Sequence, residues 1–165
     1  MSFGGWAIEK ECFDYIRSIL PEGSTVLELG SGGGTAELSK YYKVISIEQD
    51  INYIGKYDST YIHAPLKQYE GIPYPWFDVD VLKRELPKHF YDIILVDAPV
   101  AGMQRPTARH GFHYFIDLFN TDNIPIVFDD VNRDGDYENM LITANVLGRE
   151  FEVHKYNKWF GVILP

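Results

Sequence analysis

An apolar run that leads directly into a glycine-rich stretch constrains the fold of this 165-residue chain more than any other feature. The run is Val26–Leu29, and glycine occupies four of the five positions that follow, 30–34. Glycines after a strand let the backbone turn tightly and approach a ligand closely, and free amide groups at the start of the next helix then face that ligand. The pattern predicts a strand, a turn and a helix that bind a nucleotide-like ligand.

Apolar runs rich in Val and Ile recur along the chain, and with the first run they lie at residues 25–29, 44–47, 61–63, 93–96 and 124–128. They do not alternate cleanly between apolar and polar residues, which is typical of parallel strands covered on both faces. Helices are expected at residues 8–20, 36–42, 51–57, 79–86, 107–119 and 137–147. A terminal antiparallel hairpin is expected from residues 151–156 and 159–164. The sequence therefore predicts a three-layer α/β fold, a Rossmann-like doubly wound sheet of seven strands with helices on both faces.

Composition narrows the class of partner and the expected location. The 24 acidic and 15 basic side chains give a net charge of −9, which opposes nonspecific binding to a phosphate backbone, so no nucleic-acid partner is expected. The single cysteine, Cys12, cannot form an intramolecular disulfide, and no apolar stretch is long enough to suggest a membrane span. We expect a single domain over residues 1–165, located in the cytoplasm.

Two acidic residues end predicted strands beside the glycine-rich turn. Glu48 follows the second strand, where a carboxylate is positioned to accept hydrogen bonds from two ribose hydroxyls. Asp97 follows the fourth strand, next to the switch point at which open α/β sheets bind ligands. We therefore expect Glu48 to contact a ribose and Asp97 to face the reaction site.

The glycine spacing distinguishes two families of nucleotide-binding fold. The dinucleotide fingerprint requires a third glycine at position 35, which is Thr35 here. Glu28 followed by glycines at 30, 32 and 34 instead resembles the acidic GxGxG motif of class I S-adenosylmethionine-dependent methyltransferases. The resemblance implies strand order 3-2-1-4-5-7-6 with the seventh strand antiparallel. It also implies a set of cofactor-binding residues: Glu28, Gly30, Ser31, Gly32, Gly34, Glu48, His63 and Asp97.

Carboxylates at two strand ends are similar to those of the metal-dependent branch typified by catechol O-methyltransferase. In that branch an Asp ends strand four and an Asp-Asn pair ends strand five, and the matching residues here are Asp97, Asp129 and Asp130. The resemblance implies a divalent cation such as magnesium, for which carboxylate oxygens are suitable ligands. The alternative is that Asp130 or Asn132 caps the last helix and methyl transfer needs no metal.

The general base is not fixed by this resemblance, because the lysine expected three residues after the strand-four Asp is Val100. His110 is the candidate base, because it begins the predicted helix that faces the site and imidazole titrates near neutral pH. The acceptor is expected to be a small molecule or a glycan, since Asp97-Ala98-Pro99 followed by Arg105 is also similar to glucuronoxylan O-methyltransferases. The alternatives are a noncatalytic methyltransferase-like scaffold, an NAD-type oxidoreductase and an aminopropyltransferase.

Overall fold

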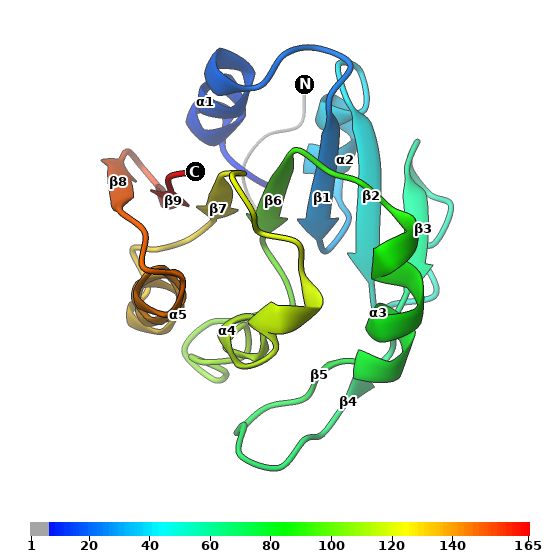
Figure 1. The fold of residues 1–165 in the computed structure, drawn as a ribbon, viewed down its shortest axis with the longest axis vertical. Helices are drawn as coiled ribbons and strands as arrows, with labels where there is room; N and C mark the ends of the chain where they lie inside the picture. The colour runs from blue at the N-terminus through cyan, green and yellow to red at the C-terminus, as the bar shows by residue number, and fades with distance from the viewer. Residues whose placement is uncertain (1–6) are drawn as a thin grey trace.

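The computed structural model describes residues 7–165 and contains a seven-stranded sheet of order β3-β2-β1-β6-β7-β9-β8 (Figure 1). The strands, in chain order, are β1 (Thr25–Leu29), β2 (Lys43–Glu48), β3 (Thr60–His63), β6 (Ile93–Val96), β7 (Ile126–Phe128), β8 (Phe151–Lys155) and β9 (Trp159–Ile163). The neighbouring strands β3, β2, β1, β6 and β7 pair in parallel, whereas β9 pairs antiparallel with both β7 and β8. The predicted strand order and the antiparallel terminal hairpin are thus confirmed.

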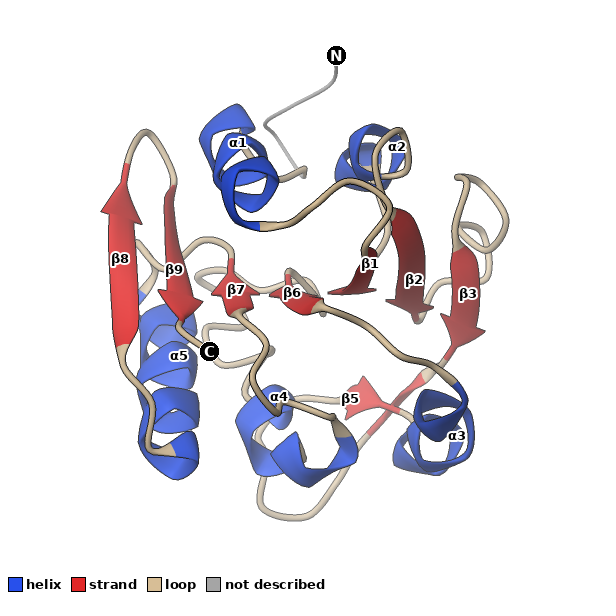
Figure 2. Cartoon of the chain, turned by 45° about the horizontal axis from the view of Figure 1, so that its top comes forward, coloured by secondary structure: helices blue, strands red, loops and turns tan. Residues whose placement is uncertain are grey.

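Helices cover both faces of the sheet (Figure 2). They are α1 (Lys10–Ile19), α2 (Gly33–Leu38), α3 (Val79–Glu85), α4 (Gly111–Tyr114) and α5 (Asp134–Leu147), with the 3₁₀ turns η1 (Leu86–Lys88) and η2 (Ile116–Leu118). The helices α1 and α2 lie on one face, and α3, α4 and α5 lie on the other. Each face has its own buried apolar cluster, one centred on Ile16 and Val26 and the other on Leu27 and Phe112.

Burial on both faces explains why the apolar runs do not alternate. In β6 all four residues are buried, and in β1 Val26 belongs to one cluster while Leu27 belongs to the other. Burying apolar surface is worth roughly 25 cal/mol per Å², so neither face of the central strands tolerates polar residues except near the strand ends. The buried carboxylates of the sheet, Glu28 and Glu48, accordingly lie near the carboxyl ends of β1 and β2.

Two expected helices differ from the observed structure. Residues 51–57 form turns, and Gly55 has a positive φ of 77°, which interrupts a right-handed helix. Residues 107–119 form turns, the four-residue α4 and η2 instead of one helix. The expected apolar stripe is nonetheless buried at Phe112, Ile116 and Phe119. Aromatic residues and glycine are weak helix formers, so packing rather than propensity sets this segment.

A small accessory sheet, β4 (Leu66–Lys67) with β5 (Trp76–Phe77), lies on the face that carries α3 and α4 (Figure 2). Its Trp76 is fully buried and stacks on Phe115 with a ring separation of 5.4 Å. The absence of a side chain at Gly111 makes this packing possible, since a Cβ there would lie 2.1 Å from the indole. None of the helices in residues 7–165 is both long enough and apolar enough to cross a bilayer.

Candidate active site

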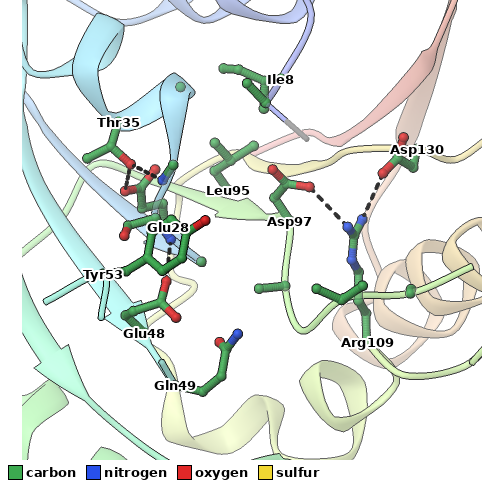
Figure 3. Close-up of a pocket in the computed structure, with 18 of the residues that line it drawn as sticks. Ile8, Glu28, Thr35, Glu48, Gln49, Tyr53, Leu95, Asp97, Arg109 and Asp130 are labelled. Atoms are coloured by element: carbon green, nitrogen blue, oxygen red, sulfur yellow. Dashed lines mark hydrogen bonds and ion pairs between the residues drawn. The ribbon is translucent and has the colours of Figure 1, made fainter. Parts of the chain in front are cut away.

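A cavity of about 680 Å³ opens where β1, β2 and β6 end (Figure 3). Its volume is within the range of roughly 300–1,000 Å³ that is typical of small-molecule sites. The residues at one end of the lining lie at the ends of β1 and β2 or shortly after them, and they are Glu28, Gly30, Ser31, Gly32, Gly34, Thr35, Glu48, Gln49, Asp50 and Tyr53. The residues at the other end are mostly charged, and they include Asp97, Arg109, Asp130, Arg133 and Lys158.

Glu48 ends β2, and its carboxylate joins the glycine-rich loop to the segment after β2. Its Oε2 accepts a hydrogen bond from the Ser31 backbone N–H at 2.9 Å, and its Oε1 accepts one from the Asp50 backbone N–H at 2.8 Å. Each carboxylate oxygen has a second lone pair, so two further donors can be accommodated. Because Glu48 is 2% exposed and lines the cavity, those donors must come from a molecule inside it.

Two glycines in the loop after β1 serve different purposes. Gly30 has a φ of 89°, and a Cβ there would lie 2.6 Å from the Cβ of Ala98, so the fold itself requires glycine. Gly32 has an extended backbone with φ of −177°, and a Cβ there would meet nothing within 4 Å. A side chain at Gly32 would therefore be accepted by the chain but would project into the cavity.

Two buried polar atoms at this end of the cavity have no hydrogen-bond partner among the described residues. They are the Ser31 Oγ and the Gln49 Oε1, and both residues line the cavity. Leaving a buried polar group unpaired costs about 1–3 kcal/mol, so a bound ligand that hydrogen-bonds to these atoms gains affinity. With the Glu48 carboxylate and the space at Gly32, they fit a ligand that carries hydroxyl and heterocyclic nitrogen groups, as a nucleoside does.

Glu28 lies deeper, on β1, with 3% of its surface exposed. Its Oε1 accepts hydrogen bonds from the Thr35 Oγ1 at 2.5 Å and from the Ser46 Oγ at 2.6 Å. The Thr35 Oγ1 in turn accepts the Gly32 backbone N–H at 2.9 Å, so Glu28 orders the glycine-rich loop through Thr35. Burial raises the pKa of Glu28 to about 7, although the two hydroxyl donors lower it.

The raised pKa of Glu28 predicts how the stability of the protein depends on pH. The folded-state pKa of about 7 exceeds the ordinary value of 4.5, so folding takes up a proton between these pH values. The stability contributed by the protonated carboxyl is fully present below pH 4.5 and is lost as the pH rises through 7. We expect Glu28→Gln to reduce the dependence of unfolding free energy on pH in this window, by up to about 3 kcal/mol. Urea unfolding at several pH values measures this difference. An unchanged pH dependence in the variant would contradict the assignment.

Three carboxylates meet at the other end of the cavity, as the sequence predicted. Asp97 follows β6 and Asp129 and Asp130 follow β7, and one oxygen from each lies within 4.8 Å of the others. Consecutive residues of an extended strand point to opposite faces, so Asp129 and Asp130 can converge only if the chain leaves the extended conformation there. It does, because β7 ends at Phe128 and Asp130 has a positive φ of 61°.

Protein cations already surround these carboxylates. Arg109 is 5% exposed, and its guanidinium lies 3.0 Å from Asp97 Oδ1 and 3.4 Å from Asp130 Oδ2 (Figure 3). It also lies 3.4 Å from Asp136 Oδ1. Arg133 pairs with Asp130 and Asp136, and Lys158 pairs with Asp129 and Asp130. Burial and the charge of Asp129 raise the pKa of Asp97, while Arg109 and Lys158 oppose the rise.

Three of the predicted residues do not line the cavity, and they are His63, His110 and Asp129. The His110 Nε2 lies 2.7 Å from the Gly135 carbonyl oxygen on α5, and His110 is absent from the cavity wall. His110 precedes the short helix α4, but its imidazole contacts α5 instead of lining the cavity, so this arrangement does not support His110 as the general base. His63 ends β3 beside Glu48 in register, but it is not part of the lining either.

Several lining residues have roles that the sequence did not reveal. Arg109 is buried within the acidic cluster, and its local sequence does not indicate this. Lys158 and Arg133 are distant in sequence from Asp97, and nothing in their local sequence indicates that they meet it. Tyr53 and Gln49 face the cavity near Glu48 (Figure 3), and their only sequence signal is their position just after that residue.

Comparisons with known proteins identify the fold. No protein-family model and no curated protein sequence matches this chain. Among solved structures, the E. cuniculi Mtq2–Trm112 complex, responsible for methylating the termination factor eRF1, aligns with a TM-score of 0.54 and 17% identity over 93% of this chain and 90% of its own. The S-adenosylhomocysteine-bound Podospora anserina methyltransferase PaMTH1 aligns with a TM-score of 0.54 and 12% identity over 93% of this chain and 76% of its own.

A Plasmodium falciparum protein described as a ribosomal RNA methyltransferase also aligns, with a TM-score of 0.51 and 14% identity over 94% of this chain and 96% of its own. The first and third of these neighbours are described as acting on different acceptors, a termination factor and ribosomal RNA, and the second holds S-adenosylhomocysteine. Identities below 25% establish a shared architecture rather than a shared reaction. The chain has the α/β Rossmann-like fold of S-adenosylmethionine-dependent methyltransferases.

Proposed function

We propose that the chain is a methyltransferase that binds S-adenosylmethionine in this cavity and methylates an oxygen of a small-molecule or carbohydrate acceptor. The observation that carries the proposal is the glycine-loop end of the cavity, where Glu48, the open space at Gly32 and the unpaired Ser31 Oγ lie together. On a methyltransferase fold, these groups supply acceptors for the ribose hydroxyls and room for the backbone of the loop to contact the ligand.

The charged end of the cavity supports the acceptor side of the proposal. When bound, S-adenosylmethionine supplies an activated methyl group on a sulfonium, so the protein must mainly align the acceptor and take up its proton. Asp97 lines the cavity between the glycine-rich loop and Arg109 (Figure 3), and its raised pKa makes it a stronger base than an ordinary carboxylate. We assign Asp97 as the group that accepts the proton of the acceptor hydroxyl.

A macromolecular acceptor is the second candidate, because the E. cuniculi and P. falciparum neighbours are described as acting on a protein and on ribosomal RNA. The net charge of −9 opposes RNA binding, since neutralising phosphates requires clustered basic side chains. The cations at the cavity do not provide such a cluster, because Arg109, Arg133 and Lys158 are all paired with aspartates. These observations favour a small or carbohydrate acceptor over a nucleic acid.

Transfer of a labelled methyl group tests this proposal. Wild-type protein is incubated with labelled S-adenosylmethionine and a panel of catechols, sugar acids, glycans, small amines, proteins and RNA. Turnover of a hydroxyl compound supports the proposal, and turnover only of protein or RNA would replace its acceptor class. Cofactor binding without turnover on any acceptor would favour the noncatalytic scaffold. Binding of NAD in place of S-adenosylhomocysteine would favour the oxidoreductase.

Glu48→Ala is expected to weaken S-adenosylhomocysteine binding by about 1.5–3 kcal/mol, the usual scale for a hydrogen bond to a charged group. Calorimetry with S-adenosylhomocysteine and with an analogue that lacks both ribose hydroxyls separates the ribose contact from any effect on the loop. The analogue should bind wild-type and variant protein equally. A loss of affinity for the analogue as large as that for the parent ligand would show that Glu48 does not bind the ribose.

A further inference from the structure

The turn of the terminal hairpin carries Lys158 to the acidic end of the cavity. Lys158 directly precedes β9. The next residue, Trp159, is hydrogen-bonded to the segment after β7 through both its carbonyl oxygen and its backbone N–H. The Val131 backbone N–H donates to the Trp159 carbonyl oxygen at 3.0 Å, and the Trp159 backbone N–H donates to the Asn132 Oδ1 at 3.3 Å. The lysine is therefore held above the two aspartates that follow β7 rather than free on a mobile turn.

The Lys158 ammonium contacts three oxygens in this position, two through hydrogen bonds and one as an ion pair. Its Nζ lies 3.2 Å from the Asp129 Oδ2, 3.0 Å from the Asp130 Oδ1 and 3.5 Å from the Ala7 carbonyl oxygen. An ammonium has three N–H donors, which matches these three oxygens. Separations of 3.0–3.2 Å suit N–H···O contacts, whereas magnesium requires its oxygens at about 2.0–2.1 Å.

The charge balance of the cluster also favours an ammonium over an added magnesium ion. The four carboxylates of Asp97, Asp129, Asp130 and Asp136 face the three cations Arg109, Arg133 and Lys158. With all four carboxylates ionised one formal negative charge remains, and protonation of Asp97, whose pKa is raised, removes it. A divalent ion added beside Lys158 would therefore leave the buried cluster with an excess positive charge. Charges removed from water are stable only when they are paired, and here the protein's own side chains provide the pairing.

We propose that Lys158 supplies the cation of this cluster, at the place where the resemblance to metal-dependent methyltransferases implies a divalent ion. Lys158 holds Asp129 and Asp130 in place, and it lines the cavity with 21% of its side chain exposed. It is thus a positioning residue whose charge also stabilises negative charge that develops on an acceptor oxygen. The catalytic part of this inference rests on the proposed function, whereas the occupancy of the cation position does not.

Manganese binding measured by electron paramagnetic resonance tests the occupancy without any assay of activity. We expect wild-type protein to show no stoichiometric Mn²⁺ site and Lys158→Ala to gain one, because the variant vacates the position between the aspartates. The site should disappear again in Lys158→Ala with Asp129→Asn. The control is Lys83→Ala, which removes the same charge from an exposed position and should behave as wild type.

Two outcomes would overturn the proposal. One is a single Mn²⁺ site in wild-type protein that Asp129→Asn removes, and this measurement stands even if Lys158→Ala does not fold. The other is a folded Lys158→Ala, checked by circular dichroism, that gains no site. Neither depends on whether S-adenosylmethionine binds, so failure of this inference is distinguishable from failure of the proposed function.

Activity provides a second readout once an acceptor is known. Wild-type turnover should resist exhaustive chelation, and Lys158→Ala should lose roughly tenfold or more in kcat. Added Mg²⁺ should restore part of that loss in the variant while leaving the wild type unchanged. Wild-type activity that falls on chelation and returns with Mg²⁺ would contradict the proposal.

Discussion

Gly32→Val is expected to lower the affinity for S-adenosylhomocysteine by at least about a hundredfold, which corresponds to about 3 kcal/mol of steric overlap. The chain itself tolerates the change, because φ at Gly32 is −177° and a Cβ there meets nothing within 4 Å. The added side chain instead fills part of the cavity that Gly32 lines. Calorimetry measures the affinity, and thermal unfolding confirms that the fold persists.

Gly30→Ala is the informative comparison for this experiment. Its Cβ would lie 2.6 Å from the Ala98 Cβ on a backbone of positive φ, so this variant should lose stability whether or not a ligand binds. The fold thus requires glycine at position 30, whereas only the ligand requires it at position 32. Unchanged S-adenosylhomocysteine affinity in a folded Gly32→Val would remove the main support for a cofactor site at this loop.

Arg109→Ala is expected to reduce the free energy of unfolding by about 3–5 kcal/mol, the usual scale when one partner of a buried ion pair is removed. The guanidinium faces Asp97, Asp130 and Asp136 and also donates to the Pro99 and Asp129 carbonyl oxygens. Its removal leaves buried carboxylates with too few cations. Urea unfolding at neutral pH measures the loss.

The matched control is Arg105→Ala, which removes the same group from an exposed position in the same loop. It should change stability by no more than about 0.5 kcal/mol. Arg109→Lys keeps the charge but not the planar fork, so it should recover only part of the loss. A loss below about 1 kcal/mol in Arg109→Ala would show that the aspartates do not depend on this side chain.

The part of the fold that could be predicted from sequence is the part that local pattern controls. The apolar runs of β1, β2 and β6 are set by burial on both faces, and the glycines after β1 mark the turn. Residues 107–119 show the limit of this reasoning. Their apolar stripe is buried as expected. The conformation of their backbone, however, depends on the packing of Gly111 against Trp76, which is far away in the sequence.

In the site, too, local sequence pattern locates some residues, whereas tertiary packing places the others. Glu48 and Asp97 could be located because each ends a strand, and the edge of a parallel sheet brings such residues together. The meeting of Asp129 with Asp130 required a left-handed residue that their sequence alone does not specify. Arg109 and Lys158 could not be assigned to the cluster, because charged side chains are mostly exposed, and only tertiary contacts bury Arg109 and partly bury Lys158.

Titration calorimetry of the wild-type protein with S-adenosylhomocysteine, and in parallel with NAD, tests whether this cavity is a methyltransferase cofactor site. We expect one S-adenosylhomocysteine site per chain, competition by S-adenosylmethionine for that site, no effect of chelation on the affinity and no heat from NAD. An absence of S-adenosylhomocysteine binding by the folded protein, or displacement of it by NAD, would contradict the assignment of this cavity as a methyltransferase cofactor site.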